Sequence, residues 1–283
     1  MDNVIRVMTD DHGFRVIACD TTETCRAILE VQRAHGEVAR ALGELCTATT
    51  LLRETMAPNL RVQGIAKGTG GRGSLVGDSF PDGSVRGLAQ VRPNGNAGSF
   101  GFGPGSVLQM MRSLPNGALH QGIVDIQGAG GLSEALMVYL QESEQVVSVA
   151  AVGAHFQGDD LRAAGGYIVQ LLPEAERPAH MIMTERLGDF PPIATFLERG
   201  GYSSKELLDE LLFGMPFTEL GRADLRFECT CSEASLLTAL ATLGRQEIRS
   251  MLEQGEGLDI TCDYCHRDYS IAIERLRALL ENS

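Results

Sequence analysis

The last fifth of the chain holds four of its seven cysteines. They form two close pairs, Cys229 and Cys231 in the order C-x-C and Cys262 and Cys265 in the order C-x-x-C, with thirty residues between the pairs. Four thiolates can complete a tetrahedral zinc site, with metal–sulfur distances of about 2.3 Å, and Zn²⁺ is the metal that such ligands commonly hold in structural sites. The pattern therefore predicts a small C-terminal zinc-binding domain, residues 227–283, with one Zn²⁺ per chain in the reduced form.

The residues around the two pairs favour closure of this site. In a regular strand, Cys229 and Cys231 would share one face while Thr230 points away, so both sulfur atoms could face the metal. Ser232 can cap a helix that runs through "EASLLTALATL", and a second helix is expected in "RQEIRSMLEQ". His266 could substitute as a ligand, but four thiolates already complete the shell, so we expect His266 on the surface.

Oxidation of the four thiols would remove the metal ligands. Each pair is close enough in sequence to form its own disulfide, Cys229 with Cys231 and Cys262 with Cys265. The metal joins points thirty residues apart, whereas these disulfides would close only very short loops. Structural zinc contributes on the order of 10–16 kcal/mol in finger peptides, against a net stability of about 5–15 kcal/mol for a typical domain. Loss of the metal should therefore unfold this domain; the alternative is a purely structural zinc knuckle.

Residues 1–175 are predicted to form an α+β domain built on antiparallel strands. The stretch "VIRVMTDDHGFRVIACD" places two β-prone runs around a turn, which is typical of a hairpin. Apolar residues at helical spacing follow over residues 21–56, with Gly36 separating two helices. Glycine-rich breaks between β-prone runs then indicate a meander, followed by a strand in "ALHQGIVDIQ", a helix near residues 132–143 and strands in "VVSVAAVGAHF" and "LRAAGGYIVQLLP".

Residues 176–226 are predicted to be a helical linker whose structure depends on its surroundings. Its short amphipathic helices are interrupted by "DFPP", "RGGYSS" and "GMP", and each is too short to be stable alone in water. The linker must therefore be held in place by packing on another part of the protein. Six of its apolar residues are expected to be packed in the resting state and to become available to other proteins if the linker loosens: Met181, Met183, Leu207, Leu208, Leu211 and Leu212.

Charge and thiol content restrict the partners and the compartment. The formal net charge of −13 opposes approach to nucleic acid and to anionic membrane surfaces, so we expect neither as a partner. The N-terminal stretch lacks the apolar run of a secretory signal, and no stretch approaches the roughly 20 apolar residues of a membrane span. We therefore expect a cytoplasmic protein, in which clustered thiols are more often metal ligands or redox-active groups than permanent disulfides.

The other motifs carry weaker signals. Gly68, Gly70 and Gly73 satisfy G-x-G-x-x-G, but "SLVGDSFPDGSVRG" follows as strand and turn, so we expect a hairpin connection rather than a dinucleotide site. There is no G-x-x-x-x-G-K-[ST] phosphate loop, and the six histidines are too dispersed to suggest a hydrolase triad. No catalytic residue is assigned, and we do not expect an enzyme. The remaining cysteines lie in apolar surroundings and are expected to be buried: Cys19, Cys25 and Cys46.

Stretches in both halves of the chain carry a family resemblance. In the cysteine region these are "FECTCS" and "ALATLGRQEIRSMLEQGEGLDITCDYCHRDYSI", and upstream they are "YLQESEQVVSVAAVG" and "AAGGYIVQLLPEA". Together they resemble the redox-regulated chaperone family known as heat-shock protein 33. The resemblance covers nearly the whole chain and keeps the order of globular part, linker and thiol-zinc part.

The resemblance implies a holdase chaperone that needs no ATP. In the family, the reduced zinc-bound form is inactive; oxidation together with partial unfolding releases zinc, loosens the linker and exposes apolar surface that captures unfolding client proteins. The family's zinc ligands are also its redox-active residues, and they map onto Cys229, Cys231, Cys262 and Cys265. Activated members form homodimers.

Two other functions stay open on the residues alone. A thiol-disulfide oxidoreductase would use Cys262 and Cys265 but needs such a pair at a helix N-terminus, whereas "TCDYCHRDYSI" leads into a β-prone run. A zinc-ribbon interaction module would keep its metal in the presence of an oxidant.

Overall fold

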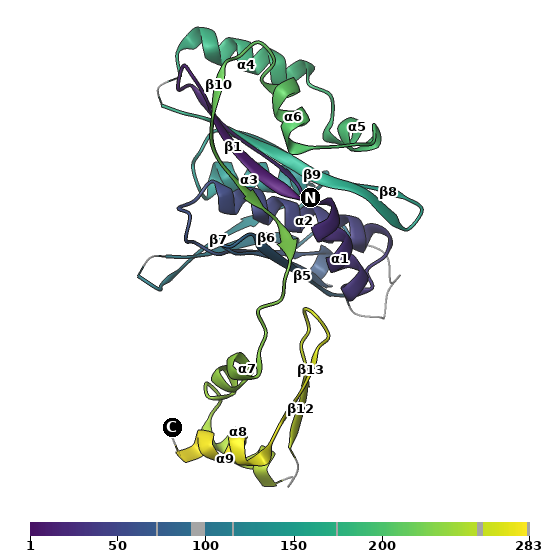
Figure 1. The fold of residues 1–283 in the computed structure, drawn as a ribbon, viewed down its shortest axis with the longest axis vertical. Coiled ribbons are helices and arrows are strands. Elements are labelled where there is room, and N and C mark those ends of the chain that lie inside the picture. Colours follow the sequence, from purple (N-terminus) through teal and green to yellow (C-terminus); the bar gives the residue numbers. More distant parts are fainter. Residues whose placement is uncertain (72, 92–99, 115, 174, 254–256, 282–283) are drawn as a thin grey trace. The chain divides into compact units, whose positions relative to one another are not determined.

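Two sheets of mainly antiparallel strands, with helices packed on them, make up the unit Met1–Glu228 (Figure 1). A second unit, Cys229–Ser283, is described by itself below. The computed structural model describes residues 1–71, 73–91, 100–114, 116–173, 175–253 and 257–281.

The first sheet has five strands in the order β10-β1-β2-β9-β8, and all neighbours are antiparallel. β1 and β2 form the expected N-terminal hairpin, in which Val7 lies opposite Val16. The strand β10 is not predicted from the sequence and lies within the segment expected to be helical linker. The strands are β1 (Asn3–Thr9), β2 (Phe14–Asp20), β8 (Ser148–Gln157), β9 (Asp160–Leu171) and β10 (Phe217–Asp224).

The second sheet has six strands in the order β11-β5-β4-β3-β6-β7. β3 and β4 pair antiparallel, with Lys67 opposite Ser74, so the G-x-G-x-x-G glycines lie in a hairpin connection as predicted. β6 is missing from the sequence prediction. The strands are β3 (Val62–Lys67), β4 (Ser74–Ser79), β5 (Ser84–Gln90), β6 (Val107–Ser113), β7 (Leu119–Asp125) and β11 (Arg226–Phe227).

Helices α1 (Thr22–Gln32), α2 (Gly36–Glu54) and α3 (Leu132–Glu142) form a layer between the two sheets (Figure 1). α2 contacts β8 and β9 of the first sheet and β3, β4 and β5 of the second, so it is buried on nearly all sides. The two N-terminal helices separated near Gly36 and the helix near residue 132 are confirmed. The result is the predicted α+β architecture.

A row of three glycines lets α2 approach the second sheet closely. Gly64, Gly77 and Gly87 lie opposite one another on three neighbouring strands. A Cβ atom at Gly64 would lie 2.7 Å from Thr49 Oγ1 of α2, and one at Gly77 would lie 2.8 Å from the same atom. Any larger side chain would push the helix away from the sheet, because these distances are far below ordinary van der Waals contact. The glycines therefore set the depth at which α2 packs.

Three helices cover the other face of the first sheet: α4 (Arg177–Asp189), α5 (Ile193–Glu198) and α6 (Ser204–Leu211). They bury a second hydrophobic cluster with residues of β1, β2 and β9, which explains why those strands are apolar on both faces. Five of the six apolar linker residues expected to be packed are buried. The prediction is wrong for Met181, because 70% of its surface is exposed.

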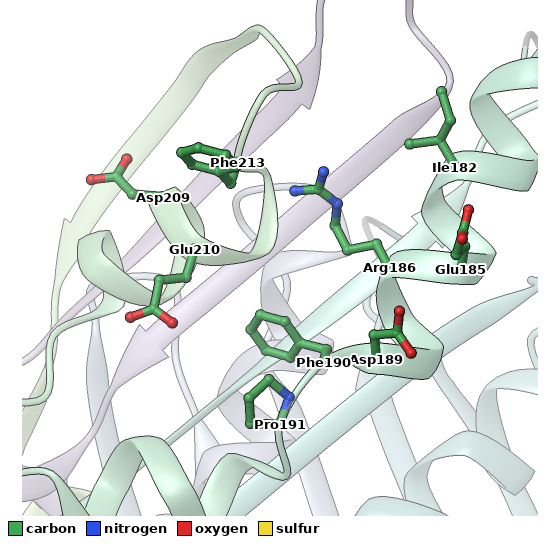
Figure 2. A pocket seen from close by; sticks show the side chains of 9 residues that line it. All are labelled: Ile182, Glu185, Arg186, Asp189, Phe190, Pro191, Asp209, Glu210 and Phe213. Atoms are coloured by element: carbon green, nitrogen blue, oxygen red, sulfur yellow. The ribbon is translucent and has the colours of Figure 1, made fainter.

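The packing of α4 and α6 leaves a hollow of about 700 Å³ on the surface of this segment (Figure 2). Ile182, Phe190 and Phe213 line it together with four carboxylates, and Arg186 of α4 donates a hydrogen bond of 3.2 Å to the carbonyl oxygen of Leu211. Phe213 is 78% exposed and Ile182 is 50% exposed. The segment therefore presents apolar surface at its outer face while its inner face is packed on the sheet.

The second unit combines three helices with a two-stranded hairpin. The side chain of Ser232 accepts a hydrogen bond from the backbone N–H of Ser235, which is the predicted cap of the first helix. Its hydrophobic cluster has Leu240, Ile271 and Leu276 as its buried members. The elements are α7 (Glu233–Leu240), α8 (Arg245–Glu253), β12 (Leu258–Thr261), β13 (Asp268–Ile271) and α9 (Ile273–Glu281).

In the part of the chain that the structure describes, none of the helices combines the length and the apolar character needed to cross a membrane.

Candidate metal centre

The four cysteines singled out in the sequence lie together in the second unit. Cys229 and Cys231 belong to the segment before α7, and Cys262 and Cys265 belong to the turn between β12 and β13. Their sulfur atoms all lie within 4.8 Å of one another. Among the described residues, this is the one group of three or more Cys, His, Asp or Glu side chains placed to hold a metal ion.

The sulfur–sulfur distances are close to those expected around a shared metal. In a tetrahedron with metal–sulfur bonds of about 2.3 Å, neighbouring sulfurs are separated by about 3.8 Å. Cys229 Sγ lies 3.8 Å from Cys262 Sγ, and Cys231 Sγ lies 3.3 Å from Cys265 Sγ. Both contacts join one pair to the other, as a metal between them requires. Four thiolates are soft donors, and this donor set fits zinc.

The backbone brings each pair to the centre in a different way. The C-x-C pair follows β11 and is not itself in a strand, which differs from the expected regular strand, but Thr230 is exposed while both cysteines are partly buried. In the C-x-x-C turn, the N–H of Cys262 donates to the carbonyl of Arg267 at 2.9 Å, and the N–H of His266 donates to the carbonyl of Cys262 at 2.7 Å. His266 is exposed, as expected.

Tyr269 is a neighbour of the centre that the sequence pattern does not single out. Its hydroxyl oxygen lies 3.1 Å from Cys231 Sγ and donates a hydrogen bond of 3.0 Å to the carbonyl oxygen of the same residue. The pKa of the nearby Arg267 guanidinium is raised, chiefly by a hydrogen bond to Tyr269 and also by the negative charge of Cys231 and Cys265. The only sequence signal for this contact is a tyrosine in the β-prone run after the last cysteine.

The four thiols interact strongly, so they titrate as a group rather than one by one. Partial burial acts to raise the pKa of Cys231, but hydrogen bonds from Tyr269 and the other three cysteines lower it to about 7. Burial raises the pKa of Cys265 to about 12; the backbone N–H of Arg267 opposes this rise, and hydrogen bonds to the other three thiols add to it. In this arrangement the four thiols therefore lose their first proton more readily than an isolated cysteine does.

The other three cysteines lie in the first unit and are buried, as predicted. Cys19, Cys25 and Cys46 belong to the hydrophobic cluster between the two sheets. Burial raises the pKa of all three thiols, to about 12 for Cys25, so they remain protonated and unreactive in the folded protein.

An α+β body followed by a separate small unit with four clustered, partly exposed cysteines defines a class of two-unit proteins whose smaller unit can be folded around a metal ion. The family model described as "Hsp33 protein" matches residues 2–272. The chain therefore belongs to the Hsp33 family of chaperones.

Individual relatives agree with this assignment. The chain is 32% identical to the 33 kDa chaperonin of Syntrophotalea carbinolica, over 99% of each chain, and 30% identical to that of Synechococcus elongatus, over 99% of this chain and 98% of the relative. The crystal structure of the 33 kDa chaperonin from Thermotoga maritima has the same fold, with a TM-score of 0.79, 22% identity and coverage of 99% of this chain and 98% of the other.

Proposed function

We propose that the chain is a redox-regulated holdase chaperone that works without ATP and is inactive in its reduced, zinc-bound form. The observation that carries the proposal is the cluster of four cysteine sulfurs within 4.8 Å, on a unit whose described hydrophobic cluster has only three buried members. Such a unit depends on its metal for most of its stability. A reaction that removes the ligands therefore removes the fold.

The proposed switch is the oxidation of two thiol pairs. In each pair, one cysteine is oxidised to a sulfenic acid by hydrogen peroxide, and the other thiol displaces water to form the disulfide. Each pair of ligating thiolates thus gives up two electrons to one peroxide, the solvent supplies two protons, and two waters are formed. The disulfides proposed are Cys229–Cys231 and Cys262–Cys265. Zinc, when bound, holds the thiolates in place, and the disulfide sulfurs can no longer ligate it.

Unfolding of the second unit would reach the linker through the chain itself. β10 ends at Asp224 and β11 at Phe227, only two residues before Cys229. α4, α5 and α6 depend on packing because short helices are marginal alone. Their release would uncover the apolar face formed by β1, β2 and β9 and would free apolar residues of the segment itself, such as Phe213 and Ile182 (Figure 2). We propose this combined surface as the one that binds unfolding proteins.

We further propose that the protein acts in the cytoplasm, that the activated form is a homodimer, and that neither nucleic acid nor membranes are partners. The net charge of −13 supports the exclusion of nucleic acid and membranes, because it repels polyanions and anionic lipid. An oxidoreductase function is not favoured, because the C-x-x-C turn leads into β13 rather than into a helix.

Zinc release and client protection measured together test this function. The reduced protein is treated with hydrogen peroxide at mildly elevated temperature, zinc is followed with a chromogenic chelator, and light scattering reports the aggregation of a denatured client. We expect about one zinc per chain to be released while aggregation is suppressed. Equal suppression by the reduced zinc form would exclude the switch. Zinc that is retained under oxidant would instead indicate a constitutive zinc-ribbon module.

A further inference from the structure

Tyr269 connects the hairpin that carries Cys262 and Cys265 with the other cysteine pair by a direct contact of its own hydroxyl. It lies on β13 directly opposite Ile260 of β12, with a partly buried side chain between the exposed residues Asp268 and Ser270. The hairpin thus fixes the ring on the side that also carries Ile271, a buried member of the hydrophobic cluster. From there the hydroxyl reaches the other cysteine pair, 38 residues earlier in the chain, at 3.1 Å from Cys231 Sγ.

A sulfur that ligates a metal carries no proton, and this fixes which group donates in the contact between Tyr269 and Cys231. A ligating Cys231 is a thiolate, so it can only accept, and the tyrosine O–H is the donor between the two groups. A hydrogen bond to an ionised acceptor is stronger than one between neutral groups. The Cys231 carbonyl oxygen, at 3.0 Å, is a second acceptor for the same proton. The hydroxyl therefore holds both the side chain and the backbone of Cys231.

The bond also withdraws charge from the sulfur. Four thiolates around one divalent cation carry a net charge of about −2, which makes the sulfurs electron-rich and open to attack by an oxidant. A donor aimed at one of them lowers its nucleophilicity. Groups that hydrogen-bond to metal ligands both orient these ligands and tune their reactivity. The contact between the Tyr269 hydroxyl and Cys231 Sγ is a side-chain O–H contact of this kind.

We propose that Tyr269 is a positioning residue of the cysteine centre, whose hydroxyl holds Cys231 in its ligand position and slows oxidation of that sulfur. It would thereby set the amount of oxidant needed to open the switch. This inference rests on the proposed function for its biological meaning. Its physical content, an O–H donor on a ligating sulfur, can be measured without any chaperone assay.

The test is Tyr269→Phe, which keeps the ring on the hairpin and removes only the hydroxyl. Under anaerobic conditions, competition with a chelator should give about tenfold weaker zinc binding. With cobalt in place of zinc, the sulfur-to-metal charge-transfer absorption should move to lower energy, because the sulfur electrons are no longer stabilised by the hydrogen bond. Release of zinc by hydrogen peroxide should become several-fold faster.

Tyr202→Phe provides the matched control. The Tyr202 hydroxyl donates to the carbonyl oxygen of Cys19 at 2.8 Å in the first unit, so this variant also loses one bond from tyrosine to a backbone carbonyl but leaves the centre untouched. It should bind zinc, absorb and release metal as the unsubstituted protein does. Circular dichroism of the zinc-loaded variants checks that both are folded.

The outcomes separate this inference from the proposed function. If the unsubstituted protein binds no zinc, or keeps it under oxidant, the proposed switch fails before Tyr269 is considered. If that protein behaves as proposed and Tyr269→Phe has the same zinc affinity, cobalt spectrum and release rate, the positioning role is wrong. A change confined to the melting temperature would also overturn it, because it would mean that the hydroxyl is only a structural contact.

Discussion

Removal of the metal from the reduced protein should unfold residues 229–283 and leave the two sheets of the first unit and the helices between them folded. Amide hydrogen exchange followed by mass spectrometry is the measurement. We expect protection in α7, α9 and the β12–β13 hairpin to fall to nearly that of an unfolded chain after treatment with a strong chelator. Protection in α2, β3 and β4 of the first unit should remain unchanged.

The physical reason lies in the small hydrophobic cluster of the second unit. Leu240, Ile271 and Leu276 are its buried members in the described part of the unit, and Ile248 is buried besides them. Each fully buried apolar side chain contributes only about 1.5–3 kcal/mol. A bound structural zinc is worth on the order of 10–16 kcal/mol in finger peptides. A single core in a unit of this size, Cys229–Ser283, rarely supplies more than about 3–5 kcal/mol, so the metal decides whether the unit folds.

Two controls complete this experiment. Addition of zinc to the stripped protein should restore protection, which shows that the loss is reversible and not caused by the chelator. Cys262→Ser should give the same loss in the presence of zinc, because the centre then has three thiolates instead of four. Protection that survives in the metal-free protein would mean that the second unit folds on its own, and the switch would need another explanation.

Much of the first unit could be predicted because its elements carry local signals. The hairpin β1–β2, helices α1 to α3 and strands β8 and β9 all show apolar periodicity bounded by turn residues. β10 lacks such a signal: it reads "FTELGRAD", is largely exposed and becomes a strand only because it pairs with β1, more than two hundred residues earlier. A strand defined by long-range pairing on a charged, half-exposed segment cannot be read from its own pattern.

The candidate metal centre, too, could be predicted only in part from the sequence. The spacing of Cys229, Cys231, Cys262 and Cys265 is enough to predict that four thiols meet, since both pairs are short and the connecting helices allow the chain to return. Tyr269 could not be assigned, because its contact with Cys231 depends on the register of the β12–β13 hairpin. Met181 was expected to pack with the other linker residues but lies on the outer face of α4, which the weak amphipathic pattern of that helix did not resolve.

Leu211→Ala should make the reduced, zinc-loaded protein suppress aggregation without any oxidant. Leu211 is fully buried at the end of α6, a helix that packs on β1 and β2. Truncation of a buried leucine to alanine costs about 2–5 kcal/mol. α6 has eight residues and cannot persist unsupported, so loss of this contact should detach the helix from the sheet and expose the apolar face beneath it.

The measurements are light scattering of a denaturing client with the reduced variant, and hydrogen exchange in α6. Lys205→Ala is the matched control on the same helix: Lys205 pairs with Asp209 on the exposed face, and such surface pairs contribute about 0–1 kcal/mol. It should leave α6 protected and the reduced protein inactive. If Leu211→Ala loosens α6 and yet activity still requires oxidation, the helical segment is not what keeps the reduced form inactive. The apolar surface would then have to come from the second unit itself, whose unfolding exposes the residues around Ile271 and Leu276.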